Sequence, residues 1–394
     1  MNVQQKGVIT LIKSALNNKC YELPNAFALE GVIEIAREHQ ISPIVYYGAI
    51  NCGYDKACDV MQKLFEKALP LVLFDEMQNA ALSEISREFE KGGIEYMPLK
   101  GSVLKSLYPK TEMRTMGDVD ILIKTEQYES VKKVMSDLGF DKKVESDHEF
   151  VWLKDNLCIE LHKRLIPSYN KDFYAYFGEG WQLAKQCTDF RYTMDDEAFF
   201  IHLITHFAKH YRDGGIGIKH LVDIWVYKTA KPELDFEYIK NELLKLRLDK
   251  FFEYVEKTLE NWFENGEETP ETEFISDTVF RSGVYGNKET AEVSTMLRET
   301  KDGKSVAGTK FSRFFGVVFL PYGKMCEKYK VLRKLPFLLL FMWIVRLFDI
   351  LLFKRKKMSA YIEKQKSITK DTVKSRKKEL NSVGLDFYTE EDVK

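Results

Sequence analysis

The sequence has little that would direct it to an oxidising compartment or to a nucleic acid. Its six cysteines lie at positions 20, 52, 58, 158, 187 and 326, and no two of them form a CxxC pair. No secretory signal sequence opens the chain, so we expect free thiols in a reducing cytoplasm. The formal net charge of the 394 residues is only −1, which gives no support to a nucleic-acid-binding protein.

Apolar residues, by contrast, are plentiful enough for several buried cores. Hydrophobic side chains make up 45% of the sequence, and its length predicts two or three structural units. Helical periodicity runs up to Gly93, and short strand-like runs follow it, which together predict an α+β fold with a small mixed β-sheet between helical regions. The predicted segments are a helical region at 1–93, an α/β core at 94–192, a helical domain at 193–300, and an apolar helix with a basic tail at 301–394.

Two aspartates interrupt an apolar run in the segment GDVDILI. Asp118 and Asp120 stand two positions apart, and because side chains alternate along a strand, both carboxylates project from the same face. Aspartate is disfavoured inside strands, and edge strands, the alternative, are more usually blunted with lysine. Neighbouring carboxylates repel each other unless a cation lies between them, and Mg²⁺ is usually held by one or two carboxylates together with substrate phosphates. The pair therefore predicts a magnesium site.

A Gly-Ser pair precedes these aspartates at the head of a short helical run. Gly101 and Ser102 offer backbone N–H groups at a helix N-terminus, with no side chain on the glycine, and such an arrangement binds phosphates. One segment thus combines a metal site with a phosphate cradle, which is the chemistry of nucleotidyl transfer.

This pattern resembles the nucleotidyltransferase superfamily that includes DNA polymerase beta and the antibiotic nucleotidyltransferases, although the spacer between Ser102 and Asp118 is longer than in the general superfamily pattern. The flanking residues look like a bacterial branch of uncharacterised nucleotidyltransferases. The motifs that carry this closer likeness are Pro98-Leu99-Lys100-Gly101, Leu107-Tyr108-Pro109, Arg114, Gly117-Asp118-Val119-Asp120 and Ile159-Glu160-Leu161-His162.

The resemblance implies a third acidic residue, on a later strand, that completes the metal site formed by Asp118 and Asp120. Glu160 is the candidate, because the run LCIELH alternates and places Glu160 and His162 on one face. Glu160 would hold the activating metal or act as the base for an acceptor hydroxyl. His162 would bind substrate or orient Glu160. The alternative is a half-buried strand with an ordinary polar outer face.

Several basic residues lie near the predicted site. The matched motifs favour Lys100 and Arg114 as nucleotide-binding residues beside Gly101, Ser102 and His162, and a guanidinium makes bidentate contacts with phosphate. Lys105 and Lys124 are interpreted as ordinary solvated charges. Lys219 follows a glycine-rich turn and is a further candidate, although an ion pair with Asp223 four residues later is equally consistent with the spacing.

Three histidines, His202, His206 and His210, recur every four residues in a predicted helix. Such spacing could ligate zinc, but zinc motifs usually add a nearby glutamate or cysteine set. A helix face packed toward the sheet is the favoured interpretation. A third interpretation is that His206, Lys209 or His210 contacts the nucleotide.

A strongly apolar run at 335–353 is followed by the basic sequence KRKK. Its length is just sufficient to cross a bilayer, but Arg346 and Asp349 lie inside it, at a spacing that allows them to pair. A helix buried in the protein and an amphipathic helix in the membrane interface, with contact through 335–357, are equally consistent with the pattern. A helix that spans the membrane is the third and least favoured interpretation.

The resemblance implies an Mg²⁺-dependent enzyme, with Mn²⁺ as a substitute, whose metal ligands and catalytic residues are Asp118, Asp120 and Glu160. It would move a nucleoside monophosphate from an NTP, with ATP as the first candidate, onto a hydroxyl of a sugar, small molecule or protein, and release pyrophosphate. The alternative is a catalytically silent nucleotide-binding or partner-binding protein with the same fold. The expected location is the cytoplasm, with peripheral contact to the inner face of the membrane.

Overall fold

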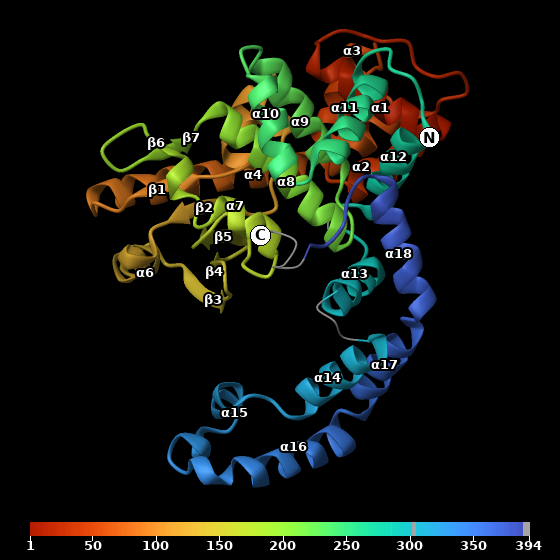
Figure 1. The fold of residues 1–394 in the computed structure, drawn as a ribbon. Coiled ribbons are helices and arrows are strands. Elements are labelled where there is room, and N and C mark those ends of the chain that lie inside the picture. The colour runs from red at the N-terminus through yellow and green to blue at the C-terminus, as the bar shows by residue number, and fades with distance from the viewer. Residues whose placement is uncertain (285, 302–304, 389–394) are drawn as a thin grey trace. The chain divides into compact units, whose positions relative to one another are not determined.

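The computed structural model describes residues 1–284, 286–301 and 305–388. Two compact units emerge: Met1–Lys288 together with Ser382–Lys394, and Glu289–Asn381. Figure 1 shows the element order along the chain. The predicted boundaries at 93/94 and 192/193 fall inside the first unit, and the domain division drawn from the sequence stays a prediction.

The first unit begins with helices, as the periodicity of residues 1–93 predicted. The first helix starts with a capping box, in which the Asn2 side chain accepts from the Gln5 backbone and the Gln5 side chain accepts from the Asn2 backbone, each at 2.9 Å. The last of these helices ends at Gly92, and Gly93 has a φ of +64° that lets the chain turn into the sheet. The four helices are α1 (Val3–Leu16), α2 (Ile33–Glu38), α3 (Ser42–Asn51) and α4 (Asp59–Lys91).

A five-stranded sheet follows, with the spatial order β1-β2-β5-β4-β3. The β2–β5 pair is parallel and the other three pairs are antiparallel, so the predicted small mixed sheet and α+β class are confirmed. Helix α6 (Tyr128–Asp137) follows β2 along the chain. The strands are β1 (Tyr96–Pro98), β2 (Val119–Ile123), β3 (Asp141–Glu145), β4 (Glu149–Lys154) and β5 (Leu157–His162).

The apolar side chains of the sheet pack against those of α4 and α6 and form one core with them. Val119, Ile121 and Ile123 of β2 are fully buried there, as the alternation in GDVDILI predicted. Ile159 and Leu161 of β5 join the same cluster. The residues between them in sequence, Asp120 and Glu160, are left on the opposite side of the sheet.

Helices complete the first unit. α8 packs on α9 and α10, and α11 packs on α12 and on α1 from the N-terminal region. The turn between α8 and α9 contains Gly214 and Gly215, with φ angles of +155° and +97°, and it lets the two helices present side chains to the same cavity. The elements of this part are α7 (Lys171–Phe177), β6 (Ala184–Gln186), β7 (Tyr192–Met194), α8 (Asp196–Asp213), α9 (Ile218–Ala230), α10 (Phe236–Lys245), α11 (Asp249–Phe263) and α12 (Pro270–Ser282).

The second unit is helical and has a small core around Met325, Cys326 and Leu332. No single helix of the described part of the chain is long and apolar enough to cross a membrane. One pair, Pro336–Ile350 with Arg355–Ser367, passes that test only jointly, across a bend of 89°. The helices are α13 (Lys288–Lys301), α14 (Val306–Val318), α15 (Tyr322–Lys328), α16 (Leu339–Phe353), α17 (Arg355–Ser367) and α18 (Lys370–Ser382).

Candidate active site

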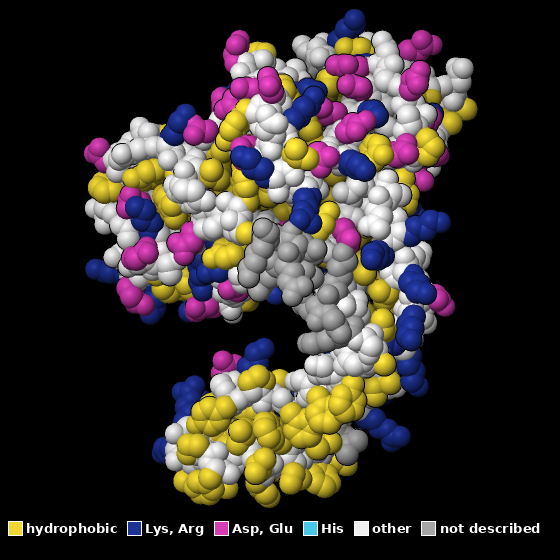
Figure 2. All heavy atoms as spheres, viewed as in Figure 1, with side chains coloured by type: hydrophobic (Ala, Val, Ile, Leu, Met, Phe, Trp, Pro, Cys, Tyr) yellow, Lys and Arg dark blue, Asp and Glu magenta, His cyan; other side chains and the backbone are white. Residues whose placement is uncertain are grey.

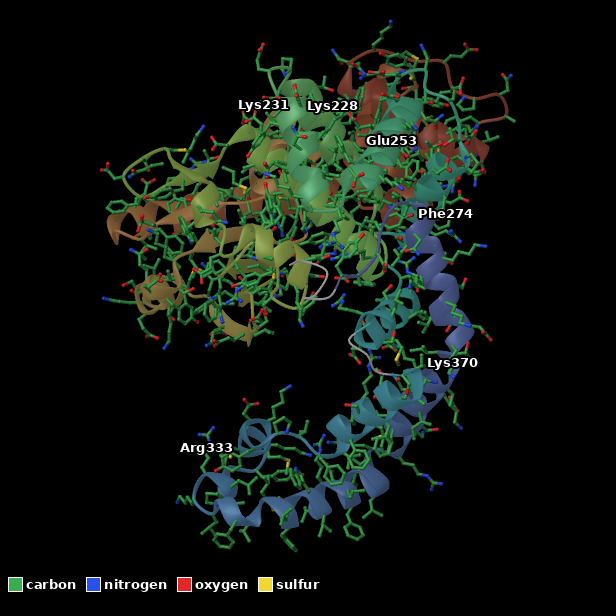
Figure 3. The ribbon with its side chains drawn as sticks, in the orientation of Figure 1. Lys228, Lys231, Glu253, Phe274, Arg333 and Lys370 are labelled. Carbon is green, nitrogen blue, oxygen red and sulfur yellow. The ribbon has the colours of Figure 1, made fainter. Side chains whose placement is uncertain are left out.

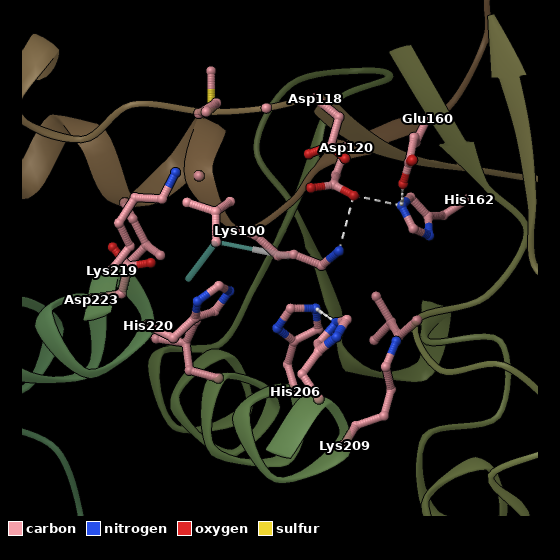
Figure 4. Close-up of a pocket in the computed structure, with 18 of the residues that line it drawn as sticks. Lys100, Asp118, Asp120, Glu160, His162, His206, Lys209, Lys219, His220 and Asp223 are labelled. Carbon is pink, nitrogen blue, oxygen red and sulfur yellow. Dashed lines mark hydrogen bonds and ion pairs between the residues drawn. The ribbon is translucent and has the colours of Figure 1, made fainter. Parts of the chain in front are cut away.

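A cavity of about 310 Å³ lies in the first unit between the polar face of the sheet and helices α8 and α9. Figure 4 shows the acidic side chains of the sheet on one side of it, residues of the two helices on the other, and Lys100 reaching in between. The titratable side chains that line it are Lys100, Arg114, Asp118, Asp120, His148, Glu149, Glu160, His162, His206, Lys209, His210, Lys219, His220 and Asp223.

The predicted carboxylates converge in this cavity. Asp120 of β2 is the direct partner of Glu160 in the parallel β2–β5 register, so the two side chains leave adjacent strands on the same face. Asp118 lies immediately before β2 and also lines the cavity. The sequence motif and the strand pairing together therefore bring the three acids into one site (Figure 4).

The charges of these acids are strongly perturbed. Burial, followed by repulsion from Asp118, Asp120 and Glu149, raises the pKa of Glu160 to about 8. Burial and the neighbouring Asp120 likewise raise the pKa of Asp118. Burial also acts against the ionised form of Asp120, but the Lys100 ammonium and the hydrogen bond from His162 outweigh it and hold the Asp120 pKa well below its usual range. Asp120 is thus ionised, whereas Glu160 retains a proton at neutral pH.

Lys100 provides the positive charge nearest to the acids. Its Nζ donates to Asp120 Oδ1 at 2.9 Å, and its side chain is only 17% exposed. The backbone of Lys100 has φ +44° and ψ −113°, a region that non-glycine residues rarely adopt. Strain of this kind costs about 1–3 kcal/mol and is typical of functional sites. The conformation carries the chain from β1 into the short helix α5 (Gly101–Leu104) and aims the lysine at Asp120.

Gly101 lines the cavity next to Lys100, and its backbone is closely packed. A Cβ added there would lie 2.8 Å from Met116 Sδ and 2.9 Å from Met116 Cγ, so a side chain at this position would require the Met116 side chain to move. Ser102, the other half of the predicted phosphate cradle, is not among the residues that line the cavity, and its Oγ lies 4.0 Å from Met116 Sδ. The phosphate-binding role of both residues stays a prediction.

The donor set suits a divalent cation. Asp120, Glu160 and His162 each offer one ligand atom, and these atoms lie within 4.8 Å of one another. His162 is buried and donates through Nε2 to Asp120 Oδ1 at 2.6 Å, while its Nδ1 is buried without a hydrogen-bond partner among the described residues. A divalent cation would relieve the repulsion that keeps Glu160 protonated, and the carboxylate oxygens of Asp120 and Glu160 are ligands that suit Mg²⁺ or Mn²⁺, whereas an imidazole ligand is more typical of softer metals. The residues present therefore fit such an ion.

Arg114 is held by the protein. Its Nε and Nη2 donate to the two carboxylate oxygens of Asp223 at 2.7 and 2.8 Å, and its Nη1 donates to the Thr115 carbonyl. The Tyr108 hydroxyl adds a third bond to Asp223 at 2.7 Å. This buried clamp fixes the segment before β2 to α9. Arg114 still lines the cavity, and its contact with phosphate stays a prediction.

Lysines from the two helices face the acids from across the cavity. Lys219 of α9 donates to the Thr115 carbonyl at 3.3 Å and to the Thr115 hydroxyl at 3.4 Å. Asp223, the ion-pair partner that the spacing allowed for Lys219, is bound by Arg114. Burial and the charge of Arg114 lower the pKa of Lys219 to about 7. Burial and the charge of Lys100 lower the pKa of Lys209 on α8 to about 8. The carboxylates near these two lysines, among them Glu149 and Asp223, only partly offset the effects of burial and of the like charges on the two pKa values.

The histidines of α8 divide between the cavity and the core. His206 and His210 line the cavity with their Nε2 atoms 3.0 Å apart, and His220 of α9 stacks on His206. Burial keeps the pKa of all three well below the usual value, so they are neutral. His202 is fully buried and does not line the cavity. Neither the zinc nor the nucleotide interpretation of this face is tested by the structure.

One sequence interpretation near the site is wrong. Lys105 is not a solvated charge: it is 5% exposed, and its Nζ donates to Asp75 at 2.5 Å and to Asn79 at 2.6 Å. The helix α4 carries both acceptors, so this buried pair ties α4 to the segment after Gly101. Lys124 is half-buried and pairs with Glu95 at 2.7 Å.

Three titratable lining residues had not been considered as site residues from the sequence: His148, Glu149 and His220. Glu149 starts β4 and is the register partner of His162, and the His148 imidazole lies 2.9 Å from its carboxylate. The turn at Asp155 joins β4 to β5, and counting back from it would have placed Glu149 beside His162 on the polar face. No comparable local signal marks His220.

Comparison with known families identifies the class of this protein. Residues 25–264 match a family described as uncharacterised nucleotidyltransferases, and because the match covers more than half of the chain, the protein belongs to this family. This confirms the family predicted from the Gly-Ser and Asp-x-Asp motifs, and it makes the protein a transferase enzyme.

Two further comparisons complete this picture. Among solved structures, the chain is similar to the solution structure of the antibiotic-resistance factor ANT(2'')-Ia, with 15% sequence identity and a TM-score of 0.33. That alignment covers 48% of this chain and 97% of the other. No curated protein matches the chain.

Proposed function

We propose that this nucleotidyltransferase moves a nucleoside monophosphate from an NTP to a hydroxyl-type acceptor in a reaction that requires Mg²⁺ or Mn²⁺ and releases pyrophosphate. The observation that carries the proposal is the direct pairing of Asp120 with Glu160, with Asp118 beside them, in a cavity whose opposite wall supplies Lys209 and Lys219. Acids on one wall suit metal ions, and ammonium groups on the other suit a triphosphate.

Asp118, Asp120 and Glu160 would hold the metal ions. A bound divalent cation lowers the pKa of the attacking hydroxyl and neutralises the charge of the phosphates. The chemical step forms a bond between the acceptor oxygen and the α-phosphorus and breaks the bond from that phosphorus to the bridging oxygen. The leaving group is pyrophosphate.

The protein's own groups would position and neutralise the reactants. Lys209 and Lys219 would pair with the phosphate oxygens, which favours their charged form over the weakly charged state that burial imposes. Glu160 could accept the proton of the acceptor hydroxyl only after a bound cation has displaced its own proton and left it as a carboxylate. Lys100 would keep Asp120 ionised and in place until the site is filled.

The test is a thermal-stability series with each of the four NTPs, with and without Mg²⁺, followed by measurement of pyrophosphate release in the presence of candidate acceptors. A ligand at a hundred times its Kd should stabilise the fold by roughly 2.7 kcal/mol. We expect Mg²⁺-dependent stabilisation by at least one NTP, with ATP as the first candidate, and its loss in Asp118→Asn/Asp120→Asn.

The matched control is Asp155→Asn, which removes one carboxylate from the exposed β4–β5 turn and keeps a residue type suited to its φ of +52°. Stabilisation that persists in the double variant would contradict the assignment of the site. Stabilisation without pyrophosphate release for any acceptor would favour the silent nucleotide-binding alternative.

A further inference from the structure

An unusual apolar face lies in the second unit, on helices α14 and α16 and on the turn before α16. Phe353 is 81% exposed, Phe337 75% and Leu340 70%, values rarely seen for such large side chains. Figure 2 shows hydrophobic side chains gathered over the segment that contains α14 and α16. We call the following residues the apolar face: Phe311, Phe314, Phe315, Phe337, Leu340, Phe341, Ile344, Phe348, Leu352 and Phe353.

The residues of this face that belong to α16 follow a helical spacing. Phe341, Ile344, Phe348 and Leu352 succeed one another at intervals of three or four positions, so they form one stripe along the helix, and Phe337 lies in the turn just before it. Contiguous apolar surface of this kind on a water-soluble protein marks an interaction site.

The polar groups of α16 point away from the stripe and are satisfied inside the second unit. Arg346 donates to the carbonyls of Val318 and Val317 at 3.1 and 2.8 Å, and the Trp343 indole donates to the Leu320 carbonyl at 3.0 Å. Asp349 pairs with Lys328 at 2.8 Å and with Lys354 at 3.1 Å, and the Lys354 side chain is still 46% exposed. The charges inside the apolar run therefore fasten α16 to α14 and α15, and they do not interrupt its exposed face.

The second unit is also strongly basic. Residues 289–381 contain 22 lysines and arginines against 9 aspartates and glutamates, a net charge of +13, whereas the remaining residues carry −14 in a chain of net charge −1. Lys354, Arg355, Lys356 and Lys357 follow the stripe directly. Figure 3 marks Arg333, in the turns before α16, and Lys370, at the start of α18, as further members of this basic surround.

We propose that the second unit docks on an anionic lipid bilayer, with α16 lying in the membrane interface, the apolar face inserted among the acyl chains, and Lys354–Lys357 against the headgroups. An in-plane helix with an apolar face and flanking basic residues binds membranes by area burial and by electrostatic attraction to anionic lipids.

The apolar face and the basic residues of the second unit together favour a lipid surface over other binding partners. A nucleic acid would satisfy the basic residues but would leave a stripe of phenylalanine and leucine in water. A second copy of this unit would bury the stripe, but it would bring two surfaces of high positive charge together. A lipid bilayer, which is apolar inside and anionic at its surface, meets both requirements. This inference does not depend on the proposed transfer reaction.

The test is flotation of the full chain with vesicles of neutral phosphatidylcholine or of phosphatidylcholine with 30% phosphatidylglycerol. We expect binding to the anionic vesicles that weakens with added salt, and little binding to the neutral ones. Replacing Lys354, Arg355, Lys356 and Lys357 with glutamine should weaken binding by roughly a hundredfold or more. Phe341→Ser/Phe348→Ser should weaken it by at least about tenfold.

Matched controls exist on the first unit. Leu244 has the same exposure as Phe341 and Phe348, 59%, and Leu73 is 57% exposed, so Leu244→Ser/Leu73→Ser removes similar exposed apolar groups. Glutamine at Lys63, Lys67, Lys132 and Lys133 removes the same charge from exposed positions. Both controls should bind as the wild type does. Hydrogen exchange should slow across 337–353 when anionic vesicles are added, and not across α10.

Three results would overturn the proposal. Equal binding to neutral and anionic vesicles would remove the electrostatic component. Absence of vesicle binding, with a dimer that Phe341→Ser/Phe348→Ser dissociates, would assign the face to a second copy. Absence of vesicle binding, with salt-sensitive binding to DNA or RNA that the glutamine variant loses, would assign the basic residues to a nucleic acid.

Discussion

Asp120 and Glu160 are direct partners across the parallel strands β2 and β5, yet their protonation differs: Asp120 is ionised and Glu160 keeps its proton near neutral pH. The difference comes from Lys100 and His162, which both contact Asp120 Oδ1. The site therefore holds one fixed negative charge and a second carboxyl that readily becomes charged when a cation arrives. Predictions about metal, pH and mutations follow from this pair.

Removing Glu160 should change how stability depends on pH. Its pKa rises from 4.5 to about 8 on folding, so the native state binds the extra proton between these values and the free energy of unfolding falls as pH rises through that window. Glu160→Gln should abolish this decline in metal-free protein and, after allowance for partial exposure, increase stability at pH 8.5 by about 3 kcal/mol. Urea unfolding of the wild type and of Glu160→Gln at pH 5, 7 and 8.5 measures this pH dependence.

The control for this experiment is the exposed Glu179→Gln, which should keep the wild-type pH dependence. Saturating Mg²⁺ should flatten the wild-type profile, because the cation stabilises the ionised carboxylate. A wild-type profile identical to that of Glu160→Gln would show that Glu160 has an ordinary pKa.

Asp118→Asn and Asp120→Asn should both reduce turnover by about a thousandfold or more, because each removes a carboxylate from the metal site. Their effects on stability should differ. Asp120→Asn leaves the buried Lys100 without its counter-charge and should cost about 3 kcal/mol, whereas Asp118→Asn relieves repulsion and should cost nothing. Steady-state kinetics and urea unfolding of the two variants distinguish these roles.

Lys219→Met should make the free protein more stable and weaken its binding of NTP. Burial lowers the Lys219 pKa to about 7, so its ammonium is costly in the free protein. The contribution of Lys219 to the free energy of unfolding should therefore rise with pH between about 7 and 10.5, because the unfolded state binds the extra proton, opposite in sign to the contribution of Glu160. The methionine should raise the melting temperature of the free protein and weaken NTP binding by roughly ten- to a hundredfold. Unchanged NTP affinity would exclude Lys219 from the phosphate site.

The Arg114–Asp223 clamp should matter for stability. Arg114→Lys loses the bidentate geometry at a buried carboxylate and should destabilise the protein by about 2–4 kcal/mol. The exposed pair of Arg37 with Glu34 offers the control, since Arg37→Lys there should change stability by less than about 0.5 kcal/mol. If both variants unfold alike, Arg114 is free to serve a phosphate.

Strong local motifs made much of this protein predictable. The alternation in GDVDILI and LCIELH correctly placed Val119, Ile121 and Ile123 in the core and Asp120 and Glu160 on the polar face. The family followed from the same motifs and is confirmed. These features depend on period and residue type, which a single sequence displays.

The features that escaped prediction depend on tertiary packing. Strand β3, Asp141–Glu145, is exposed at every position and pairs at the sheet edge, so it has no apolar alternation to reveal it. Lys105 seemed an ordinary solvated charge because its partner Asp75 is thirty residues away on another helix. His220 enters the cavity only because the turn at Gly214 and Gly215 folds α9 back along α8.

The most direct measurement of the central claim is Mn²⁺ binding, followed by electron paramagnetic resonance, in the presence of a non-hydrolysable ATP analogue. Free Mn²⁺ has a sharp signal that is lost on binding, so a titration, compared with a series that contains the analogue without protein, counts the ions that the protein binds. The account predicts stoichiometric binding to the wild type that is lost in Asp120→Asn and Glu160→Gln and retained in Asp155→Asn. Wild-type binding that Asp120→Asn and Glu160→Gln leave unchanged would contradict the assignment of Asp118, Asp120 and Glu160 as the metal site.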